Sequence, residues 1–227
     1  MQILFEDLHC VCVAKPAGLL TQGTRGGEPT LEDAVRLYLA KGDPGKAVYV
    51  GTVHRLDRPV SGVVLWAKTP KAAHRLSDQF AQRVVKKTYW AITESRVDPK
   101  PSGVWDDWLT AVGPAGVARC LTSESAQVKR AITHYRIGHE RPGLSEHGLA
   151  VVLNPTTGRT HQLRAQSATH LAPILGDVAY GATSPEWRHP GIALHARRIE
   201  VEHPILHSPL MIEAPLPEGW PSPRLFV

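Results

Sequence analysis

Many short apolar segments, each about as long as one β-strand, constrain the fold of this chain more than any other feature. Several are joined by connections too short for the crossovers that parallel strands require. The sequence therefore predicts a mixed α/β or α+β fold in which antiparallel strands dominate. The predicted strands lie at residues 2–5, 10–14, 48–53, 63–67, 88–93, 150–153, 192–201 and 209–213.

Three helices are predicted between these strands. Thr30 opens a capping box before apolar residues at helical spacing, and Thr69 precedes Pro70, a proline that suits the first helical position. Thr160 is the expected cap of a third helix that runs to about His170. Residues 94–130 mix proline, glycine, serine and charge, so we expect hairpins and loops of low regularity there.

The length of 227 residues suits one well-packed catalytic domain, although an elongated fold with two sublobes would also fit. Hydrophobic residues make up 42% and charged residues 21%, a balance that predicts a fully folded chain. The sequence contains neither repeats nor a linker long enough to separate domains. We therefore expect a single domain over residues 1–227.

The overall charge and the cysteines narrow the function only a little. A formal net charge of +5 and a pI of 9.2 favour polyanionic partners without singling one out. Cys10, Cys12 and Cys120 lack the spacing of a zinc site, so we expect them to be reduced, buried and structural. The N-terminus lacks the pattern of a signal peptide, and no apolar run approaches the length of a membrane helix. A cytoplasmic protein that does not associate with membranes is expected.

The first group of residues with chemical potential is the cluster His54-Arg55-Leu56-Asp57-Arg58, followed by Ser61-Gly62, between two apolar strands. A carboxylate flanked by two arginines is biased toward its ionised form, which a nucleophile or a base requires. A surface salt bridge on a turn is the alternative interpretation.

The second group, Gly158 to Arg164, is a glycine turn that leads directly into a helix. Backbone N–H groups at a helix start, together with Arg159 and Arg164, suit a phosphate or a carboxylate. An ordinary capped helix with a solvent-exposed basic turn is the alternative, although cations oppose the positive end of the helix dipole.

The third group is Lys86-Lys87-Thr88-Tyr89-Trp90, in which Tyr89 and Trp90 alternate across a predicted strand and face opposite sides. A tyrosine can stack on a base and donate a hydrogen bond, but aromatic residues in strands more often serve packing. Taken alone, this pattern leaves both interpretations open.

Together the three groups resemble the RluA family of RNA pseudouridine synthases. The cluster around Asp57 is similar to the family's HRLDxxTSG signature, Lys87-Thr88-Tyr89 to its K-x-Y motif, and residues 158–164 to its GRTHQ[IL]R motif. The similarity extends to Lys15-Pro16-Ala17-Gly18-Leu19, to Pro173–Asp177 with Tyr180, to Leu194-His195-Ala196, and to His203-Pro204 with Glu213-Ala214-Pro215. It covers nearly the entire chain in the expected order.

The resemblance implies the pseudouridine synthase fold and an isomerase that converts uridine to pseudouridine in structured RNA, either tRNA or rRNA. It implies Asp57 as the catalytic residue, Tyr89 as the group that stacks on the base and transfers a proton, and Arg164 as the partner of the aspartate. Arg55 would fill the space that the flipped nucleotide leaves. Because the reaction gains no atom or electron, neither a cofactor nor a metal is expected. We also expect a monomer. The further RNA-binding residues implied are His54, Arg58, Lys86, Lys87, Arg159 and His161.

Two positions depart from the family pattern. Val60 stands where a threonine is usual, so a hydroxyl that could fix the loop is lost. Gln166 stands where a histidine is frequent, and we expect this change to alter contact with RNA. The S4-like module that precedes some relatives is not expected here.

Two rival functions use the same residues. A metal hydrolase could draw its ligands from His54, Asp57, His161 and His195, although none of them has a diagnostic spacing. A noncatalytic RNA-binding relative would be expected to lack the aspartate or the arginine, and this chain has both.

Overall fold

The computed structural model describes residues 1–23, 27–94, 100–138, 148–185 and 187–226. Within it the chain forms two compact units. Unit 1 contains Met1–Lys86 and Ala196–Pro215, and unit 2 contains Lys87–His195 and Leu216–Val227. The expected α+β fold with a largely antiparallel sheet is confirmed, whereas the single domain over residues 1–227 stays a prediction.

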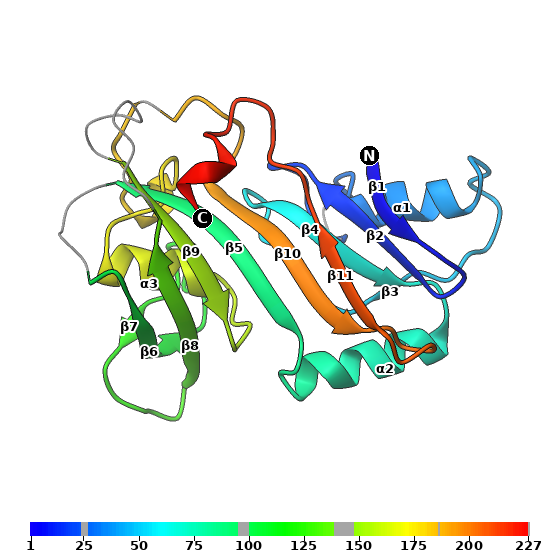
Figure 1. Ribbon diagram of the computed structural model, residues 1–227, viewed down its shortest axis with the longest axis horizontal. Helices are drawn as coiled ribbons and strands as arrows, with labels where there is room; N and C mark the ends of the chain where they lie inside the picture. The colour runs from blue at the N-terminus through cyan, green and yellow to red at the C-terminus, as the bar shows by residue number, and fades with distance from the viewer. Residues whose placement is uncertain (24–26, 95–99, 139–147, 186, 227) are drawn as a thin grey trace. The chain divides into compact units, whose positions relative to one another are not determined.

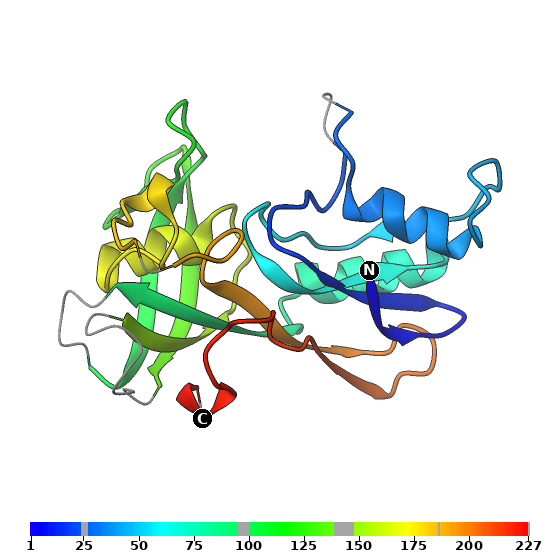
Figure 2. The same cartoon turned by 90° about the horizontal axis from the view of Figure 1, so that it is seen from above.

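Unit 1 is built on antiparallel strands with two helices. Strand β2 (Cys10–Lys15) lies between β1 (Gln2–Glu6) and β4 (Ser61–Ala67), and the short β3 (Gly51–Thr52) also pairs with β4. Strand β10 (Leu194–Glu202) pairs with β11 (Pro209–Glu213). Helices α1 (Leu31–Leu39) and α2 (Pro70–Ala81) lie on the same face of these strands (Figures 1 and 2). The core of this unit is made by the fully buried residues Cys10–Val13 and Val64–Ala67 of the two central strands.

Both helix caps of unit 1 are as predicted. The Thr30 side chain accepts a hydrogen bond from the Asp33 N–H while the Asp33 carboxylate accepts one from the Thr30 N–H, which completes the capping box. Thr69 accepts from the Ala72 N–H, and Pro70 occupies the first turn of α2. These local bonds satisfy N–H groups that a helix start otherwise leaves unpaired.

Unit 2 contains an antiparallel sheet in the order β5-β9-β8-β6-β7. Its strands are β5 (Lys86–Glu94), β6 (Ser102–Thr110), β7 (Cys120–Leu121), β8 (Val128–Ile137) and β9 (Gly148–Pro155). Helix α3 (Gln162–His170) packs against β6 and β7 (Figure 1), and short 3-10 turns lie at Val178–Tyr180 and Pro223–Leu225. Trp90 stacks on Phe226 at 4.5 Å between ring centroids, so this aromatic residue serves packing near the C-terminus.

Three expectations for unit 2 are wrong in whole or in part. The hairpins expected at 94–130 are present, since β6 pairs antiparallel with β7 and β8, but the expected low regularity is wrong because β6 is a nine-residue strand. Residues 95–99 lie outside the described residues. Helix α3 is preceded by His161 in the left-handed conformation, not by a Thr160 cap, and no side chain caps it. Of the three cysteines, all unpaired, Cys120 is only partly buried.

Among the residues that the structure describes, no helix is long and apolar enough to cross a bilayer.

The approach of β4 to β10 depends on Gly62. Its φ is +125°, and a Cβ placed there would lie 2.5 Å from the Ala196 backbone nitrogen and 2.7 Å from its carbonyl carbon. Side chains are therefore excluded by both conformation and space.

We predict that Gly62→Ala lowers the free energy of unfolding by about 2–5 kcal/mol, because it combines backbone strain with overpacking. Urea denaturation measures this loss. Gly23→Ala is the control, since a Cβ at Gly23 meets no atom within 4 Å. Equal stability of the two variants would contradict the close approach.

Candidate active site

Asp57 lies in a tight turn of unit 1 that directly precedes β4. The Val60 N–H donates to the Asp57 carbonyl at 3.1 Å, which closes the turn, and the Asp57 side chain is only partly buried. Since β4 pairs with β2 in a continuous register that brings Gly62 opposite Lys15, the turn is held at the end of two buried strands. The sheet thereby fixes where the carboxylate emerges.

A second segment, residues 15–21, holds the same turn from the side. The Arg58 carbonyl accepts hydrogen bonds from the Lys15 ammonium at 3.1 Å and from the Gly18 N–H at 2.8 Å. The Thr21 hydroxyl donates to the Leu56 carbonyl at 2.7 Å and accepts from the Leu56 N–H at 3.2 Å. We call these bonds the clamp. They fix the backbone on both sides of Asp57 and so restrict the direction of its side chain.

Lys15 is the buried cation of the clamp. Only 2% of the residue is exposed, and its ammonium also donates to the Pro16 carbonyl at 3.0 Å. Burial lowers the pKa of Lys15 to about 8, and the negative charge of Asp57 partly opposes that shift. The ammonium thus lies beside the turn that carries Asp57.

The other residues of the predicted cluster differ in how they are used. Arg55 is exposed. The His54 ring stacks on Phe80 at 5.0 Å, and its Nε2 accepts a hydrogen bond from the Leu65 N–H at 2.9 Å, so this histidine supports the loop from within. Arg58 donates through Nε to the Gly18 carbonyl at 3.0 Å and therefore also belongs to the clamp.

In unit 2, Arg164 lies in the first turn of α3, as the sequence predicts. Its Nε and Nη2 donate to the two carboxylate oxygens of Asp177, each at 2.7 Å, and both side chains are buried. Its Nη1 donates to His161 Nε2 at 3.0 Å, and the guanidinium lies over the Tyr180 ring at 4.9 Å. The proposed pairing of Arg164 with Asp57, a residue of unit 1, stays a prediction.

His161 has a strained backbone, with φ +59° and ψ +14°. A non-glycine residue in this left-handed region costs about 1 kcal/mol or more and persists where other contacts hold it. Here the ring bonds hold it, because Nε2 accepts from Arg164 and Nδ1 lies 3.1 Å from the Tyr180 hydroxyl.

The remaining predicted site residues of the third group lie on or beside β5. Tyr89 is half-buried opposite Leu153 of β9, and Lys86 is exposed. Lys87 donates to the Thr157 carbonyl at 3.1 Å, and burial lowers its pKa to about 8. Lys87 thus braces the turn before α3.

Arg159, in that turn, donates through Nε to the Arg130 carbonyl at 3.1 Å and remains partly exposed. Contact of the predicted RNA-binding residues with RNA stays a prediction in every case.

The two departures from the family pattern have structural explanations. Val60 is 2% exposed and packs in the core, and the clamp holds the loop that a threonine hydroxyl could otherwise fix. Gln166 is fully buried, donates to the Asp107 carboxylate at 2.7 Å and accepts from the Thr133 hydroxyl at 2.7 Å. Gln166 thus makes its bonds within the protein, and the expectation that it alters contact with RNA stays a prediction.

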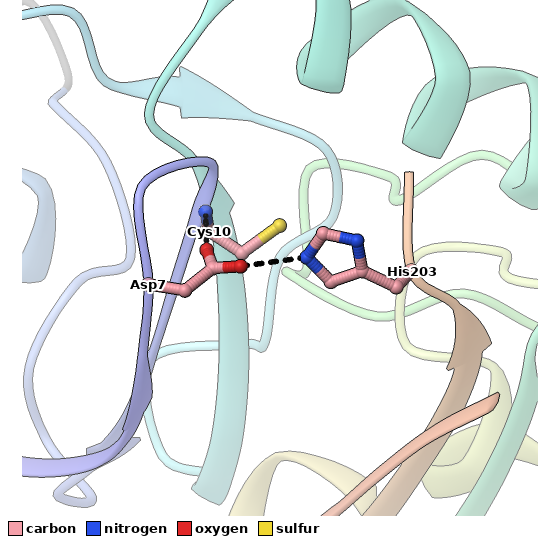
Figure 3. Close-up of side chains that lie close together, drawn as sticks. All are labelled: Asp7, Cys10 and His203. Carbon is pink, nitrogen blue, oxygen red and sulfur yellow. Dashed lines mark hydrogen bonds and ion pairs between the residues drawn. The ribbon is translucent and has the colours of Figure 1, made fainter. Parts of the chain in front are cut away.

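The metal-hydrolase alternative drew its ligands from residues of both units. The described residues contain a different group of close ligand atoms, Asp7, Cys10 and His203 in unit 1 (Figure 3). The Leu206 N–H donates to His203 Nδ1 at 2.9 Å, so the ring proton lies on Nε2, which donates to Asp7 at 2.7 Å.

This hydrogen-bond pattern does not suit a metal. A histidine that binds through Nε2 needs a lone pair there and usually donates through Nδ1, which is the opposite of the arrangement at His203. Burial raises the pKa of Cys10 to about 12, whereas a metal ligand must be a thiolate. The group therefore acts as a hydrogen-bonded link between the β1–β2 turn and the end of β10.

Sequence reasoning assigned no role to two residues of these sites, Lys15 and Asp177. Both stand in segments that resemble the family, and each is a charged residue between apolar or turn residues. That context is the signal that could have found them, since a charged side chain there is buried only when it is paired.

We predict that Lys15 affects stability in alkaline solution. Its pKa is about 8 in the folded protein and 10.5 usually, so the unfolded chain binds more protons between these values. The Lys15 contribution to stability therefore increases as pH rises from 8 to 10.5, by at most about 1.4 kcal/mol per pH unit.

The measurement is the free energy of unfolding of wild type and Lys15→Met between pH 8 and 10. The variant should show a slope less positive than wild type, while the exposed Lys71→Met should keep the wild-type slope. Identical slopes for Lys15→Met and wild type would contradict the burial of a titrating ammonium.

Comparison with known proteins shows which family the chain belongs to. The family model described as RNA pseudouridylate synthase matches residues 9–169. An uncharacterized RNA pseudouridine synthase of Zymomonas mobilis is 39% identical over 221 residues, which cover 96% of this chain and 95% of that protein. The tRNA pseudouridine synthase C of Salmonella typhimurium is 33% identical over 97% of this chain and 87% of its own length.

Two further matches agree. The ribosomal large subunit pseudouridine synthase D of Nitrosomonas europaea is 33% identical over 96% of this chain and 62% of that protein. The solved structure of human RNA pseudouridylate synthase domain containing 4 has a TM-score of 0.74 and 27% identity, and covers 96% of this chain and 89% of that chain. The chain belongs to the RluA family of RNA pseudouridine synthases.

Proposed function

We propose that this protein isomerises specific uridines in tRNA or rRNA, with Asp57 as the catalytic carboxylate. The observation that carries the proposal is the clamp, which fixes the backbone on both sides of Asp57 in a member of this family. Relatives named for tRNA and for the large ribosomal subunit support both classes of RNA. A monomer in the cytoplasm, acting without a metal, is part of the proposal.

The reaction breaks the N1–C1′ glycosidic bond of a uridine and joins C1′ to C5 of the same base. The proton that C5 loses is balanced by the one that N1 gains, so no electron or further atom is exchanged. The enzyme must therefore supply an anion beside the sugar and groups that hold and turn the base. Asp57 supplies the anion, and the clamp keeps the carboxylate directed at the reacting bond.

Tyr89 and Arg164 complete the proposed catalytic set. Tyr89 stacks on the target base and transfers the proton from C5. Arg164 donates to the Asp57 carboxylate, which keeps it ionised and oriented. Its position in the first turn of α3 and its bonds to Asp177 support a fixed guanidinium.

The target base cannot react while it is stacked in a helix, so the nucleotide must flip out. The exposed Arg55, two residues before Asp57, fills the space that the nucleotide leaves. Lys86 and Arg159 contact phosphates, which the net charge of +5 supports. His54, Arg58, Lys87 and His161 contribute by supporting the loops that face RNA, since each makes a hydrogen bond within the protein.

We predict that Asp57→Asn lowers the single-turnover rate by more than about a thousandfold and changes RNA affinity by less than about threefold. An amide has the shape of the carboxylate but cannot act as the anion. Pseudouridine is measured by chemical adduct formation and sequencing, using RNA from a strain that lacks the protein.

Asp78→Asn is the matched control, because Asp78 lies on α2 in the same unit and forms an exposed pair with His74. It should keep the wild-type rate. A rate for Asp57→Asn within about tenfold of wild type would refute the assignment of Asp57.

A further inference from the structure

The Arg164 guanidinium is held by a second carboxylate, which no motif role explains. The side chain of Asp177 is 1% exposed, and that of Arg164 is 7% exposed. Two parallel hydrogen bonds of 2.7 Å fix the plane of the guanidinium as well as its position. A single charge contact would leave that plane able to rotate.

His161 and Tyr180 restrict the same guanidinium from other directions. Because a guanidinium can only donate, His161 Nε2 accepts from Arg164, so the ring is neutral and its proton lies on Nδ1. That Nδ1–H points to the Tyr180 hydroxyl at 3.1 Å. The hydroxyl also accepts from the Ala118 N–H at 2.8 Å, which anchors Tyr180 beneath the guanidinium.

The backbone that carries Asp177 is itself tightly bonded. The Asp177 N–H donates to the Ile174 carbonyl at 2.9 Å, and the Asp177 carbonyl accepts from the N–H groups of Tyr180 at 3.0 Å and Ala182 at 3.1 Å. On the other side, Ala165 of α3 is buried in a cluster with Leu109 and other residues. Both partners of the ion pair therefore sit on rigid segments.

The ion pair with Asp177 also weakens the attraction between the Arg164 guanidinium and other anions. A guanidinium beside one carboxylate stabilises a second anion less than a guanidinium without such a partner does. Its Nε and Nη2 donate to Asp177 and its Nη1 donates to His161, so the direction of all its N–H groups is fixed.

We propose that Asp177 is a positioning residue for the isomerisation, which holds the plane of the Arg164 guanidinium and moderates the positive charge that acts on Asp57. The inference rests on the proposed function for the roles of Asp57 and Arg164. Asp177 itself acts through Arg164 and touches no reacting atom.

The experiment compares single-turnover rates across pH for Asp177→Asn and Asp177→Glu. The asparagine variant should lose at least about thirtyfold in rate, because the plane of the guanidinium is no longer held on both sides. Its rate should also begin to fall at a different pH on the acid side, since one negative charge beside the guanidinium has been removed. RNA affinity should change by less than about threefold, because the substitution does not touch RNA.

Asp177→Glu keeps the charge but displaces the carboxylate by one methylene. It should recover part of the lost rate and return the acid side of the profile to the wild-type pH. Asp106→Asn is the matched control, because it removes another two-point Asp–Arg pair of unit 2, with Arg130 at 2.8 and 2.6 Å, which is exposed. That control should leave both rate and pH profile unchanged.

A second readout does not depend on activity. The Arg164 Nε–H should give a slowly exchanging NMR signal in wild type that is retained in Asp177→Glu and lost in Asp177→Asn. If the signal behaves in this way but wild type makes no pseudouridine, the proposed function fails while the fixed guanidinium stands.

The opposite outcome separates the two proposals as clearly. If Arg164→Met is inactive but Asp177→Asn keeps the wild-type rate and pH profile, Asp177 is not a positioning residue. Should Asp177→Asn fail to fold by thermal denaturation, Asp177→Glu decides. A folded Asp177→Glu with a rate at least about fivefold below wild type supports the proposal, and one with the wild-type rate overturns it.

Discussion

The proposed site depends on two hydrogen bonds that the Arg58 carbonyl accepts, one from the Lys15 ammonium and one from the Gly18 N–H. They connect the end of β2 to the turn that carries Asp57, so the buried strands determine the direction of a half-buried carboxylate. Burial of the charged Lys15 ammonium lowers the free energy of unfolding. The decrease of its pKa from the usual 10.5 to about 8 corresponds to about 3 kcal/mol. A site that disfavours its own folding in this way is expected where placement of a charge serves function.

Unit 2 also contains a buried charged side chain beside a proposed site residue, but with different partners. Arg164 is buried against Asp177, which neutralises it, and His161 adopts a left-handed backbone that its ring contacts hold in place. Breaking one partner of such a buried pair leaves an uncompensated charge, which is why the segments that carry both residues are so heavily bonded. In both units the bonds of a buried charged side chain hold a segment that carries a proposed catalytic residue.

Elements defined by local bonds could be predicted from the sequence, and those defined by distant partners could not. The caps at Thr30 and Thr69 need only neighbouring residues, and both are confirmed. Strand β6 was missed because Asp107 occupies an inward position, where its carboxylate binds the Gln166 amide and His170. The roles of Lys15 and Asp177 stayed hidden for the same reason, since residue type does not reveal which long-range partner makes burial possible.

The most direct test of the account is a crystal structure of the Asp57→Asn variant bound to an RNA that the wild-type protein modifies. The account predicts a flipped target uridine whose C1′ lies within about 4 Å of the side chain at position 57, with the clamp intact. It also predicts the Arg164 guanidinium at hydrogen-bond distance from that side chain, still paired with Asp177. A target nucleotide that remains stacked, or a C1′ that faces a different carboxylate, would contradict the central claim.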